Sequence, residues 1–267
     1  QKDRYYSGLL IFGTAEMNGC EIFAKNYKSQ TTDRNYNTYP TTVTVWNHHT
    51  NAIEVLGDGN LSLDSSMVTC ADMAAVVIAN TDGRVIIENS VLTGKTESTI
   101  NTKGKSELIF NGNTVSGGNY SLSFGSLGNG AFEFKENRFI GSGSYPIYLL
   151  IDYASKERLD QICNQNMYTG YSQANTLLIS GTLTGQCVIP KGKYVSNGLT
   201  VASGAHLTIE AGAEIYFTTE SGLTVSGEVT TTGLEEAPVI ISGYGDELAW
   251  EGIVNRTGYM SGVRVNE

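Results

Sequence analysis

Residues 199–225 read LTVASGAHLTIEAGAEIYFTTESGLTV, so the triplet that begins at Leu199 returns at Leu223, 24 residues later. A repeat of that length is typical of stacked repeat architectures. Short apolar alternations within the stretch are separated by Gly, Ala and Ser, which indicates strands joined by tight turns. Three short strands per repeat predict one coil of a parallel β-helix.

Two columns of residues extend this repeat toward the N-terminus. The first consists of large apolar residues at nearly constant intervals: Ile53, Val77, Ile100, Leu122, Ile147, Leu177, Val201, Val225 and Trp250. The second aligns segments such as IENSVLTG at 87–94 with FNGNTVSG at 110–117. It places two sets of side chains in the core: Leu63, Ile87, Phe110, Phe134 and Cys163, and Val68, Leu92, Val115, Phe139 and Tyr168.

These columns predict an all-β fold, a single-stranded right-handed parallel β-helix of about 24 residues per coil with three short strands in each. We assign the β-helix to residues 46–267. Residues 1–45 are less regular and include a polar Asn/Thr/Tyr-rich run. Because the end of a solenoid needs an atypical unit that shields its open edge, we assign them to an N-terminal cap or an irregular first coil.

The second column also contains a polar position at a turn. Its members are Ser66, Ser90, Asn113, Asn137 and Asn166. Asn tolerates left-handed backbone conformations, and stacked side-chain amides hydrogen-bond along the solenoid axis. We therefore expect a structural ladder here, without a catalytic role.

The C-terminal quarter carries a recognisable pattern. LTIEAGAEIYF at 207–217 is followed by LTVSGEV, PVIISG and WEGI. This run resembles right-handed parallel β-helix repeat proteins of the bacterial secreted or surface type, particularly in the Bacteroides group. The resemblance implies the fold and an exported protein, at the cell surface, in the periplasm or secreted. It implies no particular activity, because the shared residues are packing and turn residues.

Net charge and hydropathy argue against a nucleic-acid partner and against a transmembrane segment. The net charge is −10, from 27 acidic and 17 basic residues, and no Lys/Arg cluster occurs. We expect no nucleic-acid partner, because such partners are bound mainly by neutralising phosphate charge. No apolar run reaches the roughly 18 residues of a membrane-spanning helix, so we expect no transmembrane segment.

Two of the four cysteines, Cys163 and Cys187, are also 24 residues apart. Residues one coil apart stack at about 4.8 Å, which lies within the range that a disulfide tolerates. The alternative is a pair of stacked free thiols in the core, which the usual burial of Cys favours. The sequence leaves both open.

Right-handed β-helices include pectate and alginate lyases and polygalacturonases, so an alternative hypothesis is a polysaccharide-active site. A lyase needs a cation such as Ca²⁺, acidic ligands and a basic residue on one outer face. Arg84, Glu88, Glu107 and Lys135 lie on such a face in the second column's frame. A solvated face of alternating charges explains the same residues and is the interpretation we favour. Outside the lyase alternative we expect no metal or other cofactor.

An apparent insertion at Asp152–Asp160 is charged and has helix-forming composition, which predicts a loop with a helical turn outside the stack. Tyrosine is abundant, with 15 residues, and several surround this insertion. Exposed Tyr beside Asp or Asn stacks on sugar rings and binds their hydroxyls. The candidate ligand-binding residues are Tyr145, Tyr153, Tyr171 and Asp152. The leading hypothesis is a non-enzymatic scaffold for adhesion or glycan binding, with a polysaccharide or a host or cell-surface glycan as partner. The alternatives are a lyase or hydrolase acting on an acidic polysaccharide, and a structural spacer within a longer surface protein.

Overall fold

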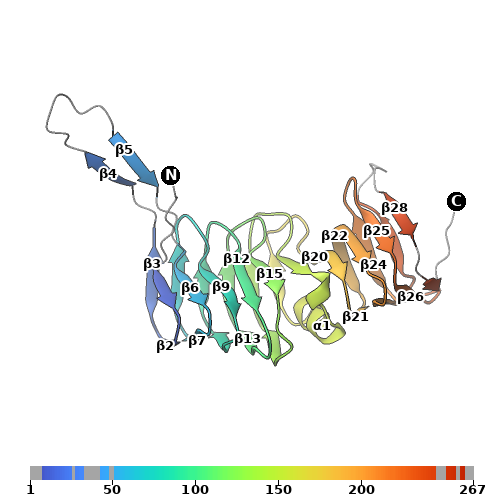
Figure 1. Ribbon diagram of the computed structural model, residues 1–267, viewed down its shortest axis with the longest axis horizontal. Coiled ribbons are helices and arrows are strands. Elements are labelled where there is room, and N and C mark those ends of the chain that lie inside the picture. Colours follow the sequence, from blue (N-terminus) through green and yellow to red (C-terminus); the bar gives the residue numbers. More distant parts are fainter. Residues whose placement is uncertain are drawn as a thin grey trace.

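A computed structural model describes residues 8–25, 28–32, 43–47, 51–244, 251–256 and 259–261. In these residues each coil lies on the coil before it and pairs with it through parallel strands (Figure 1). The predicted all-β, parallel β-helix fold is therefore confirmed.

The described strands form four parallel sheets, which we call faces 1 to 4, and one antiparallel hairpin. Face 1 follows the path β1 (Leu9–Ile11), β6 (Ile53–Leu56), β9 (Val76–Thr81), β12 (Ser98–Thr102), β15 (Leu122–Ser126), β18 (Ile147–Leu150), β20 (Thr176–Leu183), β22 (Gly192–Val201), β24 (Ala213–Phe217) and β27 (Ile240–Gly243), with β25 (Gly222–Val225) and β28 (Gly252–Asn255) beside it. Face 2 contains β2 (Thr14–Asn18), β7 (Asn60–Asp64), β10 (Val85–Glu88), β13 (Leu108–Asn111) and β16 (Phe132–Lys135).

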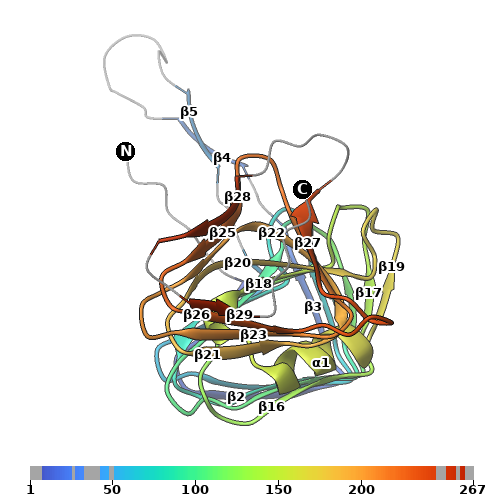
Figure 2. The ribbon, with the colours of Figure 1, turned by 90° about the vertical axis from the view of Figure 1, so that its right-hand side faces the viewer.

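Face 3 contains β3 (Glu21–Ala24), β8 (Met67–Cys70), β11 (Val91–Thr93), β14 (Thr114–Ser116), β17 (Arg138–Ile140) and β19 (Met167–Thr169). Face 4 continues the solenoid with β21 (Gln186–Ile189), β23 (His206–Glu210), β26 (Glu228–Thr232) and β29 (Tyr259–Ser261). Figure 2, along the solenoid axis, shows β2 and β16 on one side and β3, β17 and β19 on the next.

The segment assigned to the cap contains a coil with a strand on each of faces 1 to 3. β1, β2 and β3 pair in parallel with β6, β7 and β8 of the next coil. Between these two coils the chain forms the hairpin of β4 (Lys28–Thr32) and β5 (Val43–Asn47). Residues 1–7, 26–27, 33–42 and 48–50 lie outside the described residues.

Alternating side chains explain why these segments form strands. In β10, Val85 and Ile87 are buried while Ile86 and Glu88 point outward and are half-buried. Ile87 lies beside Phe110 in register, and the rings of Phe110 and its neighbour in the next coil stack with centroids 5.3 Å apart. The predicted inward positions of faces 2 and 3 thus form the core, apart from Cys163, which lies on a helix.

The 24-residue repeat of the decisive stretch is one coil, because Leu199 pairs with Leu223 in the ladder of β22 and β25. The apolar column traced from it is wrong in part. Ile53 pairs with Val76, and Val77 is half-buried on the outer side.

The column also fails at two later points. Ile100 lies beside Phe124 and not beside Leu122, and Leu177 lies beside Tyr194. Register shifts in β12, and the long strands β20 and β22, break the constant interval. Because a one-residue shift moves a side chain to the opposite face, spacing alone cannot fix the register. Trp250, the last member, lies outside the described residues.

The corner between faces 2 and 3 carries the polar ladder as a chain of hydrogen bonds. The backbone N–H of each ladder residue donates to the side chain of the ladder residue one coil later. The N···O distances are 3.1 Å for Ser66 to Ser90, 2.9 Å for Ser90 to Asn113, 3.0 Å for Asn113 to Asn137 and 3.0 Å for Asn137 to Asn166. Cys20 begins the ladder, since its N–H donates to Ser66 Oγ at 3.0 Å.

The left-handed backbone lies one position before the ladder residues, not on them. φ is +49° at Ser65, +51° at Asn89, +66° at Gly112 and +60° at Glu136. This conformation turns the chain sharply enough to expose the next N–H to the following coil. Bonds along the axis compensate for the strain that non-glycine residues bear in this region.

The insertion does not leave the stack. Its 3₁₀ turn η1 (Ile151–Tyr153) and helix α1 (Lys156–Asn164) take the place of a face 2 strand, and α1 packs between β16 and β21. Leu159 and Ile162 of α1 are buried in the core. The Gln161 side chain caps the free edge of β16: its Oε1 accepts from Phe134 N–H at 2.8 Å and its Nε2 donates to Phe132 O at 3.4 Å. The charged residues of this segment predicted a surface loop. The helix packs on the core instead, because Leu159 and Ile162 are buried there.

We expect Asn137→Ala to lower the free energy of unfolding by about 2–3 kcal/mol, because it leaves the buried Asn113 N–H without its acceptor. The substitution also removes the hydrogen bond that Asn137 Nδ2 donates to Phe110 O, which is 2.7 Å long. Urea unfolding monitored by circular dichroism measures the change. The exposed Asn119 provides the control, since Asn119→Ala should change stability by less than about 0.5 kcal/mol. Equal effects of the two substitutions would contradict the ladder's structural role.

We expect Gln161→Leu to expose the edge of β16. The amide of Phe134 should then exchange with deuterium at least about tenfold faster, because its only acceptor among the described residues is removed. Asp160→Ala, at an exposed position of the same helix, should leave that exchange rate unchanged. Unchanged Phe134 protection in Gln161→Leu would show that the helix does not cap the strand.

Candidate functional site

The residues of the lyase alternative do not converge on one point. Arg84 forms an ion pair with Glu107, with Nε and Oε2 2.5 Å apart, at the start of the face 2 strands. Glu88 lies four residues further along β10, which corresponds to about 13 Å. Lys135 pairs instead with Glu133 at 3.2 Å.

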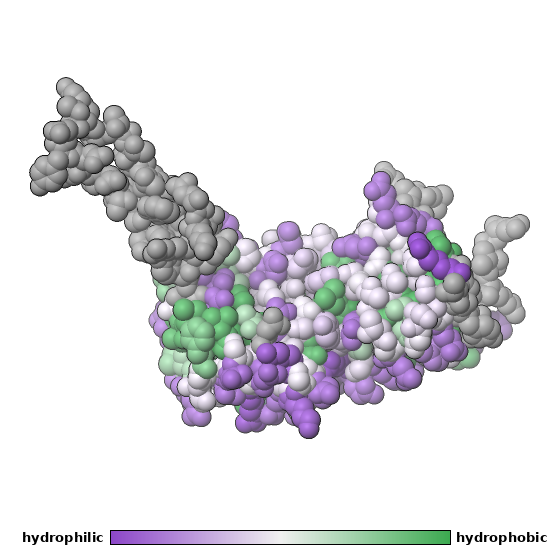
Figure 3. Space-filling view, viewed as in Figure 1, coloured by the Kyte–Doolittle hydropathy of each residue, from purple (hydrophilic) through white to green (hydrophobic). Residues whose placement is uncertain are grey.

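At the C-terminal ends of the face 2 strands, the Asn111 side-chain amide connects two carboxylates. Asn111 donates to Glu88 at 3.4 Å and to Glu133 at 3.1 Å. Its bond and the neighbouring Lys135 lower the pKa of Glu133. Figure 3 shows hydrophilic side chains along the lower side of the solenoid, where β7 and β13 lie in Figure 1. Face 2 therefore presents two ion pairs to solvent, and Glu88 is hydrogen-bonded to Asn111.

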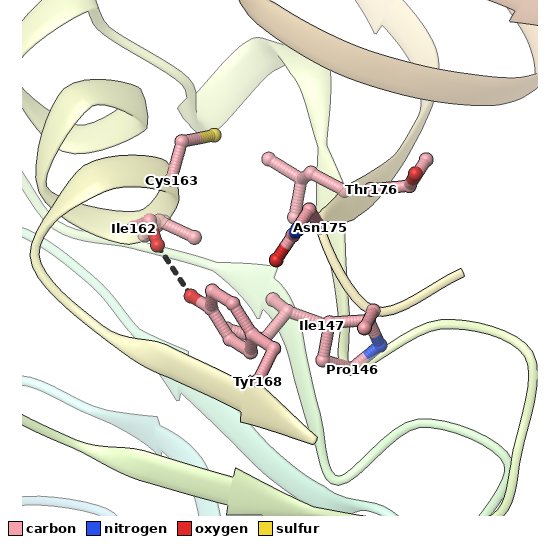
Figure 4. A pocket seen from close by; sticks show the side chains of 9 residues that line it. Pro146, Ile147, Ile162, Cys163, Tyr168, Asn175 and Thr176 are labelled. Atoms are coloured by element: carbon pink, nitrogen blue, oxygen red, sulfur yellow. Dashed lines mark hydrogen bonds between the residues drawn. The ribbon is translucent and has the colours of Figure 1, made fainter. Parts of the chain in front are cut away.

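No group of three or more His, Cys, Asp or Glu side chains that could hold a metal ion occurs among the described residues. One small cavity of about 20 Å³ lies inside the solenoid near α1, between Ile147, Ile162 and Asn175. That volume holds about one water molecule. In Figure 4 the Tyr168 hydroxyl points away from the cavity centre and donates to the Ile162 carbonyl. The cavity is a packing defect and not a substrate site.

The predicted ligand-binding residues near the insertion are structural. Tyr171 is only 6% exposed, and its hydroxyl is hydrogen-bonded to Ser121. Tyr153 packs against the core. The Asp152 carboxylate accepts from Thr184 N at 2.6 Å and from its hydroxyl at 2.8 Å, which ties η1 to the end of β20.

Tyr145, the remaining member, is half-buried, and burial raises its pKa to about 12. The predicted exposure is therefore wrong for Tyr171, which is buried, whereas Tyr145 and Tyr153 are half-buried.

The two cysteines spaced by one repeat are free thiols. Cys163 lies on α1 and Cys187 on β21, so they are not stacked in one ladder. Cys163 Sγ donates to the hydroxyl of the buried Tyr194, 3.9 Å away. Burial raises the pKa of Cys163 to about 11 and that of Cys187 to about 12, so both stay protonated at neutral pH.

Face 1 carries a different cluster, which we call the tyrosine patch: Tyr120, Tyr148, Glu97, Ser123 and Ser180. Tyr148 points outward from β18 between the buried Ile147 and Leu149. Its ring centroid lies 5.7 Å from that of Tyr120, with 30° between the ring planes. Both rings are half-buried, so each keeps an accessible surface.

Polar groups border these rings. Tyr148 Oη lies 2.7 Å from Ser180 Oγ, and Ser123 is its neighbour in the ladder of β15 and β18. Burial, with the charge of Glu97 and the nearby Tyr148, raises the pKa of Tyr120, so its hydroxyl remains a donor in alkaline solution. The tyrosine patch thus combines two aromatic surfaces with hydroxyl donors and one carboxylate acceptor.

Sequence reasoning missed the role of Tyr120 and did not select Tyr148. Strand alternation alone predicts that Tyr148 points outward, because it follows the inward-facing Ile147. No local signal pairs it with Tyr120, because the two residues meet only when their coils stack.

No protein-family model matches the chain, and no curated protein or solved structure matches it either. The resemblance to bacterial surface β-helix repeat proteins therefore stays a prediction from residues 188–254. Within the described residues, no helix has both the length and the apolar character needed to cross a bilayer.

We expect alkylation of the folded protein at pH 8 to modify Cys20 and to spare Cys163 and Cys187. With a pKa of about 11, Cys163 is thiolate in only about one molecule in 1,000 at that pH. Its reaction rate should rise as the pH approaches the raised pKa. Peptide mass spectrometry locates the modified thiols, and denatured protein, in which all four cysteines react, is the control. Rapid modification of Cys163 at pH 8 would contradict its burial.

Proposed function

We propose that this protein is a non-enzymatic β-helix scaffold that binds carbohydrate at the tyrosine patch. The observation that carries the proposal is the pair of half-exposed rings of Tyr120 and Tyr148 on a regular sheet surface. Aromatic rings stack on the apolar faces of sugars, and surrounding hydroxyl and carboxylate groups bind sugar hydroxyls.

The charges of the patch favour a particular class of glycan. Glu97 is the acidic group beside Tyr120, and the whole chain carries a net charge of −10. An acidic polysaccharide would be repelled by this surface. The proposed ligand is therefore a neutral glycan, presented as a chain that lies across neighbouring coils.

The proposal includes an exported location, at a bacterial cell surface, in the periplasm or secreted. Its support is the resemblance of residues 188–254 to β-helix repeat proteins of that type. An elongated solenoid presents one repeating surface over many coils, which suits an adhesion or display role.

A glycan array followed by calorimetry with the best ligand tests this function. Tyr148→Ala should weaken binding at least about tenfold, because it removes one stacking surface. Tyr148→Phe keeps the ring and should retain most of the affinity. Tyr216→Ala, on the same face but three strands away, is the matched control. If Tyr148→Ala binds as well as the wild type, the tyrosine patch is not the site.

The enzymatic alternative has a separate readout. Incubation with polyuronates would release unsaturated products if the protein were a lyase, and Lys135→Ala should abolish that release. We expect no product, because Lys135 is already paired with Glu133 and lies apart from Arg84.

A further inference from the structure

Face 3 differs from the other faces in its exposed side chains. Its outer side carries five exposed large hydrophobic residues, which we call the apolar stripe: Phe23 (64% exposed), Met67 (47%), Val91 (38%), Ile140 (36%) and Met167 (64%). Between residues 13 and 233, these are all the exposed large hydrophobic residues whose side chains the structure describes. Concentration of such residues on one face of a soluble solenoid marks an interaction surface.

The stripe consists of two straight columns that the strand register defines. One runs through Glu21, Met67, Val91, Thr114, Arg138 and Met167, and the other through Phe23, Thr69, Thr93, Ser116, Ile140 and Thr169. Apart from the charged Glu21 and Arg138, the remaining members are Ser or Thr residues, whose short side chains leave the large ones protruding. An open groove of about 290 Å³ at the adjoining corner borders Met67 and Val91.

The charges on this surface are placed symmetrically. Glu21 lies in the first coil and Arg138 in the fifth, in the same column, and both are exposed. Neither forms an ion pair with another described residue. Val91 occupies the third coil, midway between them.

We propose that the apolar stripe is the interface of a homodimer in which two copies pack face 3 against face 3. A two-fold axis parallel to the strands, at the level of the third coil, reverses the order of the coils and keeps each column opposite itself. Glu21 of one copy then faces Arg138 of the other, twice. Phe23 faces Ile140, and Val91 faces its own counterpart.

This arrangement satisfies what an isologous interface requires. The same surface is used on both copies, Val91 lies at its centre, and in the first and fifth coils an apolar contact of Phe23 with Ile140 lies beside each pair of opposite charges. Two sheets stacked face to face lie about 10 Å apart, a distance that these side chains fill. The dimer leaves face 1 exposed on both copies (Figure 2), so the inference is independent of carbohydrate binding.

The size of the surface sets the expected affinity. With the axis at the third coil, five of the six strands of face 3 lie opposite their counterparts, which gives a length of about 19 Å, at the small end of specific interfaces. We therefore expect a reversible dimer with a dissociation constant on the order of 10–100 µM at moderate ionic strength.

Sedimentation velocity across a concentration series up to about 0.5 mM measures this equilibrium. Arg138→Glu should weaken the dimer at least about tenfold, since it places like charges opposite each other. Combining Glu21→Arg with Arg138→Glu restores opposite charges and should return the affinity to within about threefold of the wild type. Met67→Ser, at an exposed position that does not contribute to the core, should also weaken the dimer.

Lys95→Glu, an exposed charge reversal outside the two columns, is the control and should leave association unchanged. Recovery in the double variant is the decisive result, because folding defects would not be repaired by a second charge reversal. A wild-type protein that stays monomeric at about 0.5 mM would overturn the proposal. So would a dimer whose affinity is the same in Arg138→Glu, which would place the interface elsewhere.

Discussion

Axial hydrogen bonding between coils is the constraint on which this structure depends. Every coil must repeat the register of the coil before it, because its backbone donors and acceptors have no other partners in a parallel sheet. The corner ladder applies the same rule to a turn, where the side chains of Asn113 and Asn137 accept the backbone N–H of the preceding coil. The ladder lets Ser65, Asn89 and Glu136 hold a left-handed backbone conformation, which is uncommon for Ser and Glu.

The last strand of each sheet in a solenoid has backbone groups that no further strand pairs with. Face 2 ends at β16, where the side-chain amide of a helix residue takes the place of the next strand. Gln161 pairs with the strand edge while Leu159 and Ile162 continue the core. The insertion is therefore part of the scaffold, because Tyr153 packs against the core and Asp152 accepts a hydrogen bond from Thr184.

Once the core and corners are fixed, only the outward columns remain free to vary in chemistry. Face 2 carries two ion pairs, face 1 carries the tyrosine patch and face 3 carries the apolar stripe. Each surface repeats along the axis at the strand spacing, so it presents an extended array and not a concave pocket. The proposed binding functions use these surfaces as arrays and do not require groups that converge on one point.

The sequence by itself determined the coil repeat, the inward positions of faces 2 and 3 and the members of the ladder, because period-2 alternation and turn chemistry are local properties. It did not determine that Ile53 pairs with Val76, since a shift of one residue leaves the spacing almost unchanged. Only the tertiary structure brought Tyr120 to Tyr148 and placed Glu21 and Arg138 in one column. These relationships depend on which coils become neighbours and how long each connection is. That information is distributed along the whole chain and absent from any single stretch of it.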